Sequence, residues 1–158
     1  MGTQREAATG LRKAVGVTSV AVAMGVAGVL TAQPAAAAPA QPAAPCSAAA
    51  RACVSLSAHS AWLMDNGAVT YGAVPITSGK AGHRTPTGSF QVTYKDIDHY
   101  SKAFHGPMPY SVFFTTTGVA FHQGSLSQQS HGCVHLSPEA ARTFYRTLAP
   151  GDVVEVVR

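Results

Sequence analysis

The chain has 158 residues and a formal net charge of +4, with 11 Lys or Arg against seven Asp or Glu. Its length fits one domain of ordinary size preceded by a short targeting segment. Without residues 1–38 the balance is 8 basic against 6 acidic residues, a charge of 8 − 6 = +2. So small and scattered a charge argues against nucleic acid as a partner.

Residues 1–38 are predicted to be a signal peptide. Three basic residues lie within the first 13 positions, and residues 14–30 form an uncharged run rich in Val and Ala. A transmembrane anchor is the competing interpretation of this run. Its Gly, Ser and Thr residues and the small residues near Ala36 favour cleavage instead. We therefore expect an exported protein, in the cell wall or secreted, with no stable membrane span after cleavage.

Residues 39–51 are rich in Ala and Pro, which predicts a flexible linker. Three cysteines follow the apolar run, and unpaired thiols are uncommon in oxidising compartments. Cys46 and Cys53 are close in sequence, so we expect them to form a short-loop disulfide. This pairing leaves Cys133 as the free thiol.

Residues 52–158 are predicted to form one mostly β domain with a late helix. The Asp65-Asn66-Gly67 sequence predicts a hairpin turn. The helix is expected after Ser137 as N-cap and Pro138 at its first position, and to end before Pro150. Short runs rich in β-branched and aromatic residues predict strands at 53–57, 61–64, 69–76, 88–96, 111–114, 119–122 and 153–157.

Two histidines and a glycine surround the free cysteine. The segments are Phe121-His122-Gln123-Gly124 and, shortly after, Ser130-His131-Gly132-Cys133-Val134-His135. A cysteine attacks carbonyls as its thiolate, so it needs a base or cation nearby, and either His122 or His131 can serve. Gly132 allows backbone amides to approach a substrate oxygen, which suggests an oxyanion hole beside Cys133.

Other interpretations of these residues are weaker. A lone cysteine is often a buried apolar residue, but the neighbours His131, Gly132 and His135 argue against that here. His122, His131, Cys133 and His135 are zinc-type donors, but their alternation on a strand matches no usual ligand spacing, so we predict no metal. The chain lacks the Gly-x-Ser-x-Gly sequence of a serine hydrolase. The remaining histidines, which we interpret as surface or structural residues, are His59, His83, His99 and His105.

The motif Ser130-His131-Gly132-Cys133, preceded by His122, resembles that of the YkuD-type L,D-transpeptidases. Support comes from Ser78-Gly79-Lys80, Thr85-Pro86-Thr87-Gly88-Ser89-Phe90 and Met108-Pro109-Tyr110. The resemblance implies a β-sandwich or barrel whose cysteine attacks the third residue of a peptidoglycan tetrapeptide stem and releases D-alanine. The side-chain amine of a second stem then takes the thioester and forms a cross-link.

The resemblance also implies roles for single residues. Cys133 would be the nucleophile and His122 its base, oriented by the Gln123 carbonyl. His131 would shape the pocket, and the amides of Gly132 and Cys133 would bind the oxyanion. The substrate-binding residues would be Gln123, Ser130, His135 and Tyr110. The family implies no cofactor, and we expect a monomer whose partners are the donor and acceptor stem peptides.

The sequence departs from the family pattern at two places. Only seven residues separate His122 from Ser130, so the lid over the acceptor side is expected to be small or to be supplied by residues 100–110. Position 135 is His, where Asn or Arg is usual, and an imidazole can still donate a hydrogen bond to substrate. Two alternative functions stay open, namely an L,D-carboxypeptidase that passes the same acyl-enzyme to water and a wall-binding module without catalysis.

Overall fold

The computed structural model describes residues 43–158, and this part of the chain is mostly β with one helix, as predicted. The strands and the helix, in chain order, are β1 (Ala52–Ser55), β2 (Ser60–Asp65), β3 (Ala68–Pro75), β4 (Gly88–Gln91), β5 (Tyr94–Ser101), β6 (Gly106–Phe113), β7 (Ala120–Gln123), β8 (Val134–Leu136), α1 (Pro138–Thr147) and β9 (Val153–Val157).

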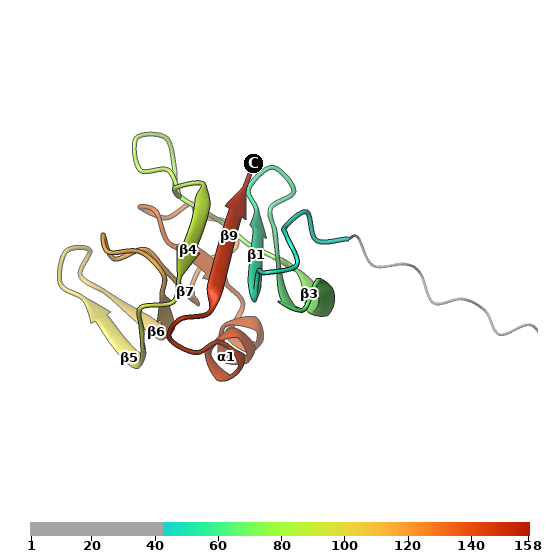
Figure 1. Cartoon of the computed structure of the whole chain (residues 1–158). Coiled ribbons are helices and arrows are strands. Elements are labelled where there is room, and N and C mark those ends of the chain that lie inside the picture. Colours follow the sequence, from blue (N-terminus) through green and yellow to red (C-terminus); the bar gives the residue numbers. More distant parts are fainter. Residues whose placement is uncertain (1–42) are drawn as a thin grey trace, which may run out of the picture. The chain divides into compact units, whose positions relative to one another are not determined.

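The strands form two sheets (Figure 1). The first has the order β3-β2-β1-β9-β4, and the second the order β5-β6-β7-β8. Neighbours are antiparallel except β1 with β9 and β7 with β8, which are parallel. Helix α1 connects β8 to β9 and packs against β6, β7 and β8. The parallel β7 and β8 pair is the part of the fold that carries the site described below.

An aromatic cluster joins the second sheet to the helix. Phe121 lies 4.9 Å from Phe114 and 5.1 Å from Phe144 between ring centroids, and all three side chains are almost fully buried. Helix α1 presents Ala140, Ala141 and Phe144 to this core, at the spacing expected of one helix face. Burial of this face fixes the helix against β7.

The helix start follows the predicted capping. The Ser137 hydroxyl accepts a hydrogen bond from the Ala140 N–H at 3.2 Å, and Pro138 is the first helical residue. Because α1 directly follows β8, this cap also fixes the end of the strand that Cys133 precedes.

Two predicted strands differ from the structure. The run 88–96 is divided into β4 and β5, because Val92 and Thr93 carry the chain from one sheet to the other. The Val92 N–H bonds the Asp152 carbonyl in one direction, and the Thr93 N–H bonds the Phe113 carbonyl in the other. The strand expected at 111–114 begins earlier, at Gly106, and pairs with β5 as a long hairpin. Polar and charged residues in this hairpin hide its strand pattern from sequence analysis.

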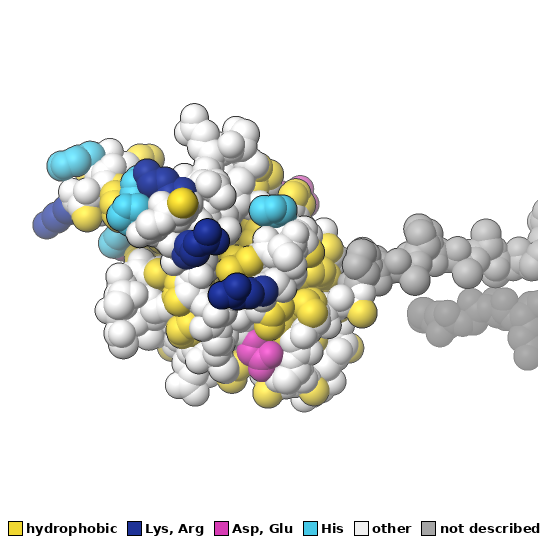
Figure 2. Space-filling view, turned by 90° about the horizontal axis from the view of Figure 1, so that it is seen from above, with side chains coloured by type: hydrophobic (Ala, Val, Ile, Leu, Met, Phe, Trp, Pro, Cys, Tyr) yellow, Lys and Arg dark blue, Asp and Glu magenta, His cyan; other side chains and the backbone are white. Residues whose placement is uncertain are grey.

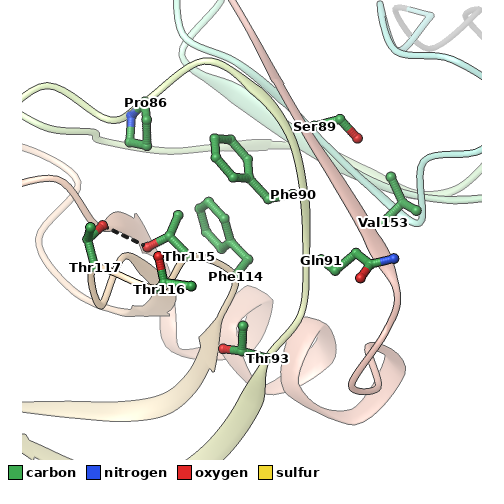
Figure 3. Close-up of a pocket in the computed structure, with 10 residues that line it drawn as sticks. All are labelled: Pro86, Ser89, Phe90, Gln91, Thr93, Phe114, Thr115, Thr116, Thr117 and Val153. Atoms are coloured by element: carbon green, nitrogen blue, oxygen red, sulfur yellow. Dashed lines mark hydrogen bonds between the residues drawn. The ribbon is translucent and has the colours of Figure 1, made fainter.

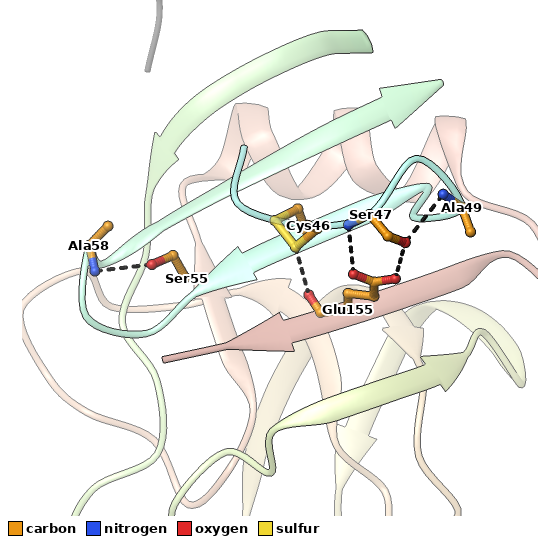
Figure 4. The surroundings of a disulfide bond; sticks show 7 residues. Cys46, Ser47, Ala49, Ser55, Ala58 and Glu155 are labelled. Atoms are coloured by element: carbon orange, nitrogen blue, oxygen red, sulfur yellow. Dashed lines mark hydrogen bonds between the residues drawn. A yellow bond between two sulfur atoms is a disulfide. The ribbon is translucent and has the colours of Figure 1, made fainter. Parts of the chain in front are cut away.

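The segment before β1 corrects the predicted linker boundary of 39–51. Cys46 is bonded to Cys53, and Ala50 is fully buried. The Glu155 carboxylate of β9 accepts hydrogen bonds from the Ser47 N–H and hydroxyl, which lowers its pKa (Figure 4). The segment from Cys46 is therefore packed, and residues 39–42 of the predicted linker lie outside the described residues.

The predicted signal peptide lies outside the described residues. Within residues 43–158, no helix is long and apolar enough to cross a bilayer.

Replacement of Phe144 by Ala should lower the free energy of unfolding by about 3–5 kcal/mol, because it leaves a cavity between α1 and β7. Phe104→Ala is the matched control, since that side chain is 58% exposed and its loss should cost less than about 0.5 kcal/mol. Urea denaturation of both variants gives the two values. Equal losses would contradict the assigned core.

Candidate active site

Strands β7 and β8 bring the predicted catalytic residues together. His122 on β7 is paired in register with His135 on β8, and Cys133 immediately precedes β8. His122 and Cys133 both line a pocket of about 180 Å³, together with Ser130, His131 and His135. We call this the histidine pocket. Residues that are 11 positions apart in sequence meet here because β7 and β8 are parallel neighbours.

The His122 ring is held in one orientation by the backbone. Its Nδ1 lies 2.8 Å from the carbonyl oxygen of Gln123. A carbonyl oxygen only accepts, so Nδ1 carries the proton and Nε2 is left as the acceptor. Burial lowers the pKa of His122 to about 4, further lowered by His135 and His99 and opposed by the Gln123 hydrogen bond. His122 is therefore a neutral base at ordinary pH.

The Cys133 side chain is only partly accessible. Burial raises the pKa of its thiol, and a backbone hydrogen bond from Ala120 acts in the opposite direction. The Sγ atom lies 3.9 Å from the Gly118 carbonyl, within reach of a weak S–H hydrogen bond. The resting pair is thus a protonated thiol and a neutral imidazole, and attack on a carbonyl requires proton transfer between them.

A braced turn presents the thiol. The Ser130 hydroxyl donates to the Cys133 carbonyl at 2.5 Å and accepts from the Gly132 N–H at 3.0 Å. Gly132 has a φ of +127°, which strongly favours glycine. Thr85, which is buried, donates its hydroxyl to the Gly132 carbonyl at 2.8 Å. The turn is therefore fixed from inside by Ser130 and from the β3–β4 loop by Thr85.

This turn changes the predicted oxyanion donors. The Gly132 N–H already donates to Ser130, so it is not free for substrate. Cys133 lies just before the β8 ladder, and no protein group among residues 43–158 accepts its N–H. The Cys133 amide is the better candidate of the two. Ser130 lines the histidine pocket, as a substrate-binding residue would, and its hydroxyl also braces the turn.

His131 lies at the mouth of the pocket under the β5–β6 hairpin. Its exposed ring stacks on Phe104 at 4.6 Å and meets the His83 ring edge-on at 4.9 Å. Phe104 stands in the hairpin turn within residues 100–110, the segment expected to supply a lid. A second cavity of about 410 Å³, the aromatic pocket, shares Phe104, Met108 and Cys133 with the histidine pocket. Its lining includes Tyr94, Tyr100, Phe104, Phe113, Gly118 and Cys133.

His135 is held by the loop after β7. Its Nδ1 lies 3.0 Å from the Ser125 carbonyl and 3.1 Å from the Thr77 hydroxyl. Its ring stands edge-on to His122 at 4.9 Å between centroids. Gly124 makes room for it, since a Cβ there would lie 2.5 Å from the imidazole. Gly124 was given no role from the sequence. Its position two residues after His122 was the available signal that a side chain approaches the backbone there.

Comparison with known proteins agrees with this geometry. The family model YkuD, described as the L,D-transpeptidase catalytic domain, matches residues 49–156. The chain belongs to this family. L,D-transpeptidase 1 of Mycobacterium tuberculosis is 32% identical over 126 residues, which is 65% of this chain and 48% of that protein. The chain thus spans about half the length of the curated relatives it matches.

Solved structures give the same fold. An L,D-transpeptidase from Stackebrandtia nassauensis superposes with a TM-score of 0.64 at 28% identity, covering 68% of this chain and 54% of that one. L,D-transpeptidase 1 of Mycobacterium tuberculosis superposes with a TM-score of 0.58 at 31% identity, covering 66% and 60%. One related structure is a complex with imipenem, with 30% identity, a TM-score of 0.59 and coverage of 66% and 56%.

Two of the predicted substrate contacts lie elsewhere in this L,D-transpeptidase domain. Tyr110 packs against Tyr145 and receives a hydrogen bond from Arg142 at 3.4 Å, so it faces α1. It lines neither the histidine pocket nor the aromatic pocket. Gln123 contributes its backbone carbonyl to His122 and does not line either pocket. Tyr110 thus supports the helix, whereas Met108 of the same motif lines both pockets with Cys133.

A larger cavity among residues 43–158 does not contain the thiol. It has a volume of about 740 Å³ and lies between β4 and the loop after β6, with Phe90 and Phe114 on its wall (Figure 3). Thr115, Thr116 and Thr117 form its opposite side, and Thr117 also borders the aromatic pocket. No Asp, Glu, Lys, Arg or His lines it, so it offers no acid, base or nucleophile comparable to Cys133.

Metal chemistry has no preformed site in the described part of the chain. Among residues 43–158, no group of three or more His, Cys, Asp or Glu side chains could hold a metal ion. The four zinc-type donors weighed from sequence include His131, which is exposed and stacked on the lid. The chemistry available here is that of the thiol and its imidazole.

The buried His122 should make stability depend on pH. Its folded pKa of about 4 lies below the ordinary value of about 6.5. Between these values the unfolded chain binds more protons, so stability is lost as pH falls from about 6.5 to 4, by about 3 kcal/mol in all. Urea denaturation of the wild type and of His122→Gln across pH 4–7 isolates this contribution. A constant difference between the two proteins would contradict the assignment.

The two hydrogen bonds of the Thr85 hydroxyl can be removed by a substitution that hardly changes the volume of the side chain. Thr85→Val should cost about 1–3 kcal/mol, because the Gly132 carbonyl and the Gly79 N–H lose a buried partner. It should also slow modification of Cys133 by a disulfide reagent, since the turn is no longer fixed. Thr87→Val, at an exposed position, is the control and should leave stability and thiol reactivity unchanged.

Proposed function

We propose that the chain is a peptidoglycan L,D-transpeptidase that forms cross-links through a thioester on Cys133. The observation that carries this proposal is the Cys133 and His122 pair in the histidine pocket, with the His122 tautomer fixed by Gln123. The names of the relatives support the same activity. The chain spans only about half the length of the curated relatives, so we propose the activity, the substrates and the partners from the site itself.

The first half-reaction forms the thioester. His122 Nε2 takes the thiol proton while Sγ bonds to the carbonyl carbon of the third stem residue, and the negative charge on the carbonyl oxygen is met by the Cys133 N–H. The carbon–nitrogen bond to D-alanine then breaks. The leaving nitrogen takes the proton from His122, so D-alanine departs as a neutral amine and His122 returns to its starting form.

The second half-reaction resolves the thioester. An acceptor amine gives its proton to His122 as it attacks the thioester carbonyl, and the carbon–sulfur bond breaks with the proton returned to Cys133. Cys133 borders both the histidine pocket and the aromatic pocket, which provides separate room for a donor and an acceptor stem. This arrangement favours transfer over hydrolysis, since a carboxypeptidase needs room for one stem only.

The proposed substrate also indicates where the protein acts. We propose that the protein acts outside the cytoplasm, after cleavage of residues 1–38, as a monomer and without a cofactor. The disulfide between Cys46 and Cys53 suits an oxidising compartment.

Mass spectrometry of the full chain with a tetrapeptide stem tests the proposal. We expect a covalent adduct on Cys133, release of D-alanine and a cross-linked dimer when an acceptor amine is present. His122→Gln should slow adduct formation by about 10²–10⁴-fold, because the proton acceptor is lost. His105→Gln is the matched control and should retain the rate within a few-fold, since His105 is exposed and lines neither the histidine pocket nor the aromatic pocket.

The other outcomes are informative. Trimmed monomer without dimer would assign an L,D-carboxypeptidase. An unreactive thiol in a folded protein that still binds cell wall would assign a binding module. Full activity in Cys133→Ala would contradict the covalent mechanism.

A further inference from the structure

A basic groove adjoins the histidine pocket, and the mechanism above does not use it. It has a volume of about 480 Å³ and is lined by Arg84, Arg158 and His59, with hydroxyls from Ser78 and Thr87 among the other polar groups. We call it the basic groove. Figure 2 views the molecule from the end where the carboxyl terminus lies in Figure 1, and Lys and Arg side chains gather near the middle of that face.

The cations of this groove have no acidic partners in the described part of the chain. Among residues 43–158, Arg51 forms ion pairs with Asp65 and Asp152, and the His99 ring contacts the Asp96 carboxylate. Neither Arg84 nor Arg158 takes part, and no Asp or Glu side chain lines the groove. An unpaired guanidinium beside hydroxyl groups is suited to a planar anion such as a carboxylate, which it can bind through two parallel hydrogen bonds.

The groove lies next to the site of chemistry. Gln129 lines both the basic groove and the histidine pocket. Arg84 directly precedes Thr85, whose hydroxyl donates to the carbonyl of Gly132, the residue before Cys133. The loop that carries Arg84 is therefore bonded to the turn that carries the thiol.

The loop that carries Arg84 is fixed to the catalytic segment. The Ser130 N–H donates to the Ser78 carbonyl and the Lys80 N–H donates to the Ser130 carbonyl, each at 3.0 Å. Gly79 is tightly enclosed, since a Cβ there would lie 2.0 Å from the His83 carbonyl. The backbone at Arg84 is thus held in a constant relation to Cys133, as a recognition site requires.

We propose that the basic groove binds a carboxylate of the donor stem next to the bond that is broken. This inference rests on the proposed function and adds a specificity determinant to it. The candidates are the two carboxylates on the residues that flank the third residue, one on the second residue and one on the terminal D-alanine, and both offer the same chemistry to Arg84. Neutralisation of the carboxylate that is recognised should weaken donor binding.

Three stems test the proposal, namely the parent and two in which one or the other carboxylate is replaced by a carboxamide. Binding to full-length Cys133→Ala is measured by calorimetry, and D-alanine release is measured with the active chain. We expect the parent to bind about tenfold more tightly than one of the carboxamides, the size of one charge-assisted contact at an exposed site. The carboxamide that loses affinity identifies which carboxylate is recognised.

Arg84→Gln should abolish this preference by weakening the parent alone, with the carboxamide stem unchanged within twofold. Arg84→Lys keeps the charge and should retain part of the preference. Arg146→Gln, which removes an exposed charge from the last turn of α1, is the matched control and should leave the preference intact.

Equal affinity of the wild type for all three stems, or equal losses for all of them in Arg84→Gln, would overturn the proposal. Absence of D-alanine release from every stem would instead overturn the proposed function, while the calorimetric comparison still decides whether the groove recognises a carboxylate.

Discussion

The Gln123 carbonyl determines which nitrogen of His122 carries a proton, and the chemistry of the site depends on that choice. At 2.8 Å from Nδ1 it keeps the proton on that atom and leaves Nε2 to accept one. The carbonyl belongs to the residue after His122 on the same strand, so the orientation follows from the local backbone of β7. Burial then keeps the ring neutral by lowering its pKa to about 4. The neutral state of His122 and the nitrogen that carries its proton therefore both follow from the position of β7 in the fold.

The nucleophile depends on a second constraint, the turn before β8. Gly132 adopts a backbone angle that strongly favours glycine, and Ser130 and Thr85 each bind one side of it. The same Thr85 follows Arg84, so one loop braces the thiol and carries a cation of the basic groove. The turn that carries Cys133 and the basic groove are therefore connected through residues 78–85.

The sequence predicted the fold class, the helix cap at Ser137 and the proximity of His122 to Cys133, because these depend on local patterns and on a dense motif. It missed the division between β4 and β5, which depends on Val92 and Thr93 bonding to different sheets. It also assigned Tyr110 to substrate, although the α1 side chains Arg142 and Tyr145 occupy its ring and hydroxyl. Contacts made across the fold by single side chains have no signature in the sequence. The packing of residues from Cys46 onward was hidden by their low-complexity composition.

The central claim is that His122 is a neutral base with its proton on Nδ1 before substrate arrives. Nitrogen NMR of the imidazoles in the full chain, with the His122 signals assigned by their absence in His122→Gln, tests this most directly. The account predicts a neutral ring protonated at Nδ1 from pH 5 to 8, with titration only near pH 4. A doubly protonated ring at pH 7, paired with a thiolate at Cys133, or a neutral ring with its proton on Nε2, would contradict it.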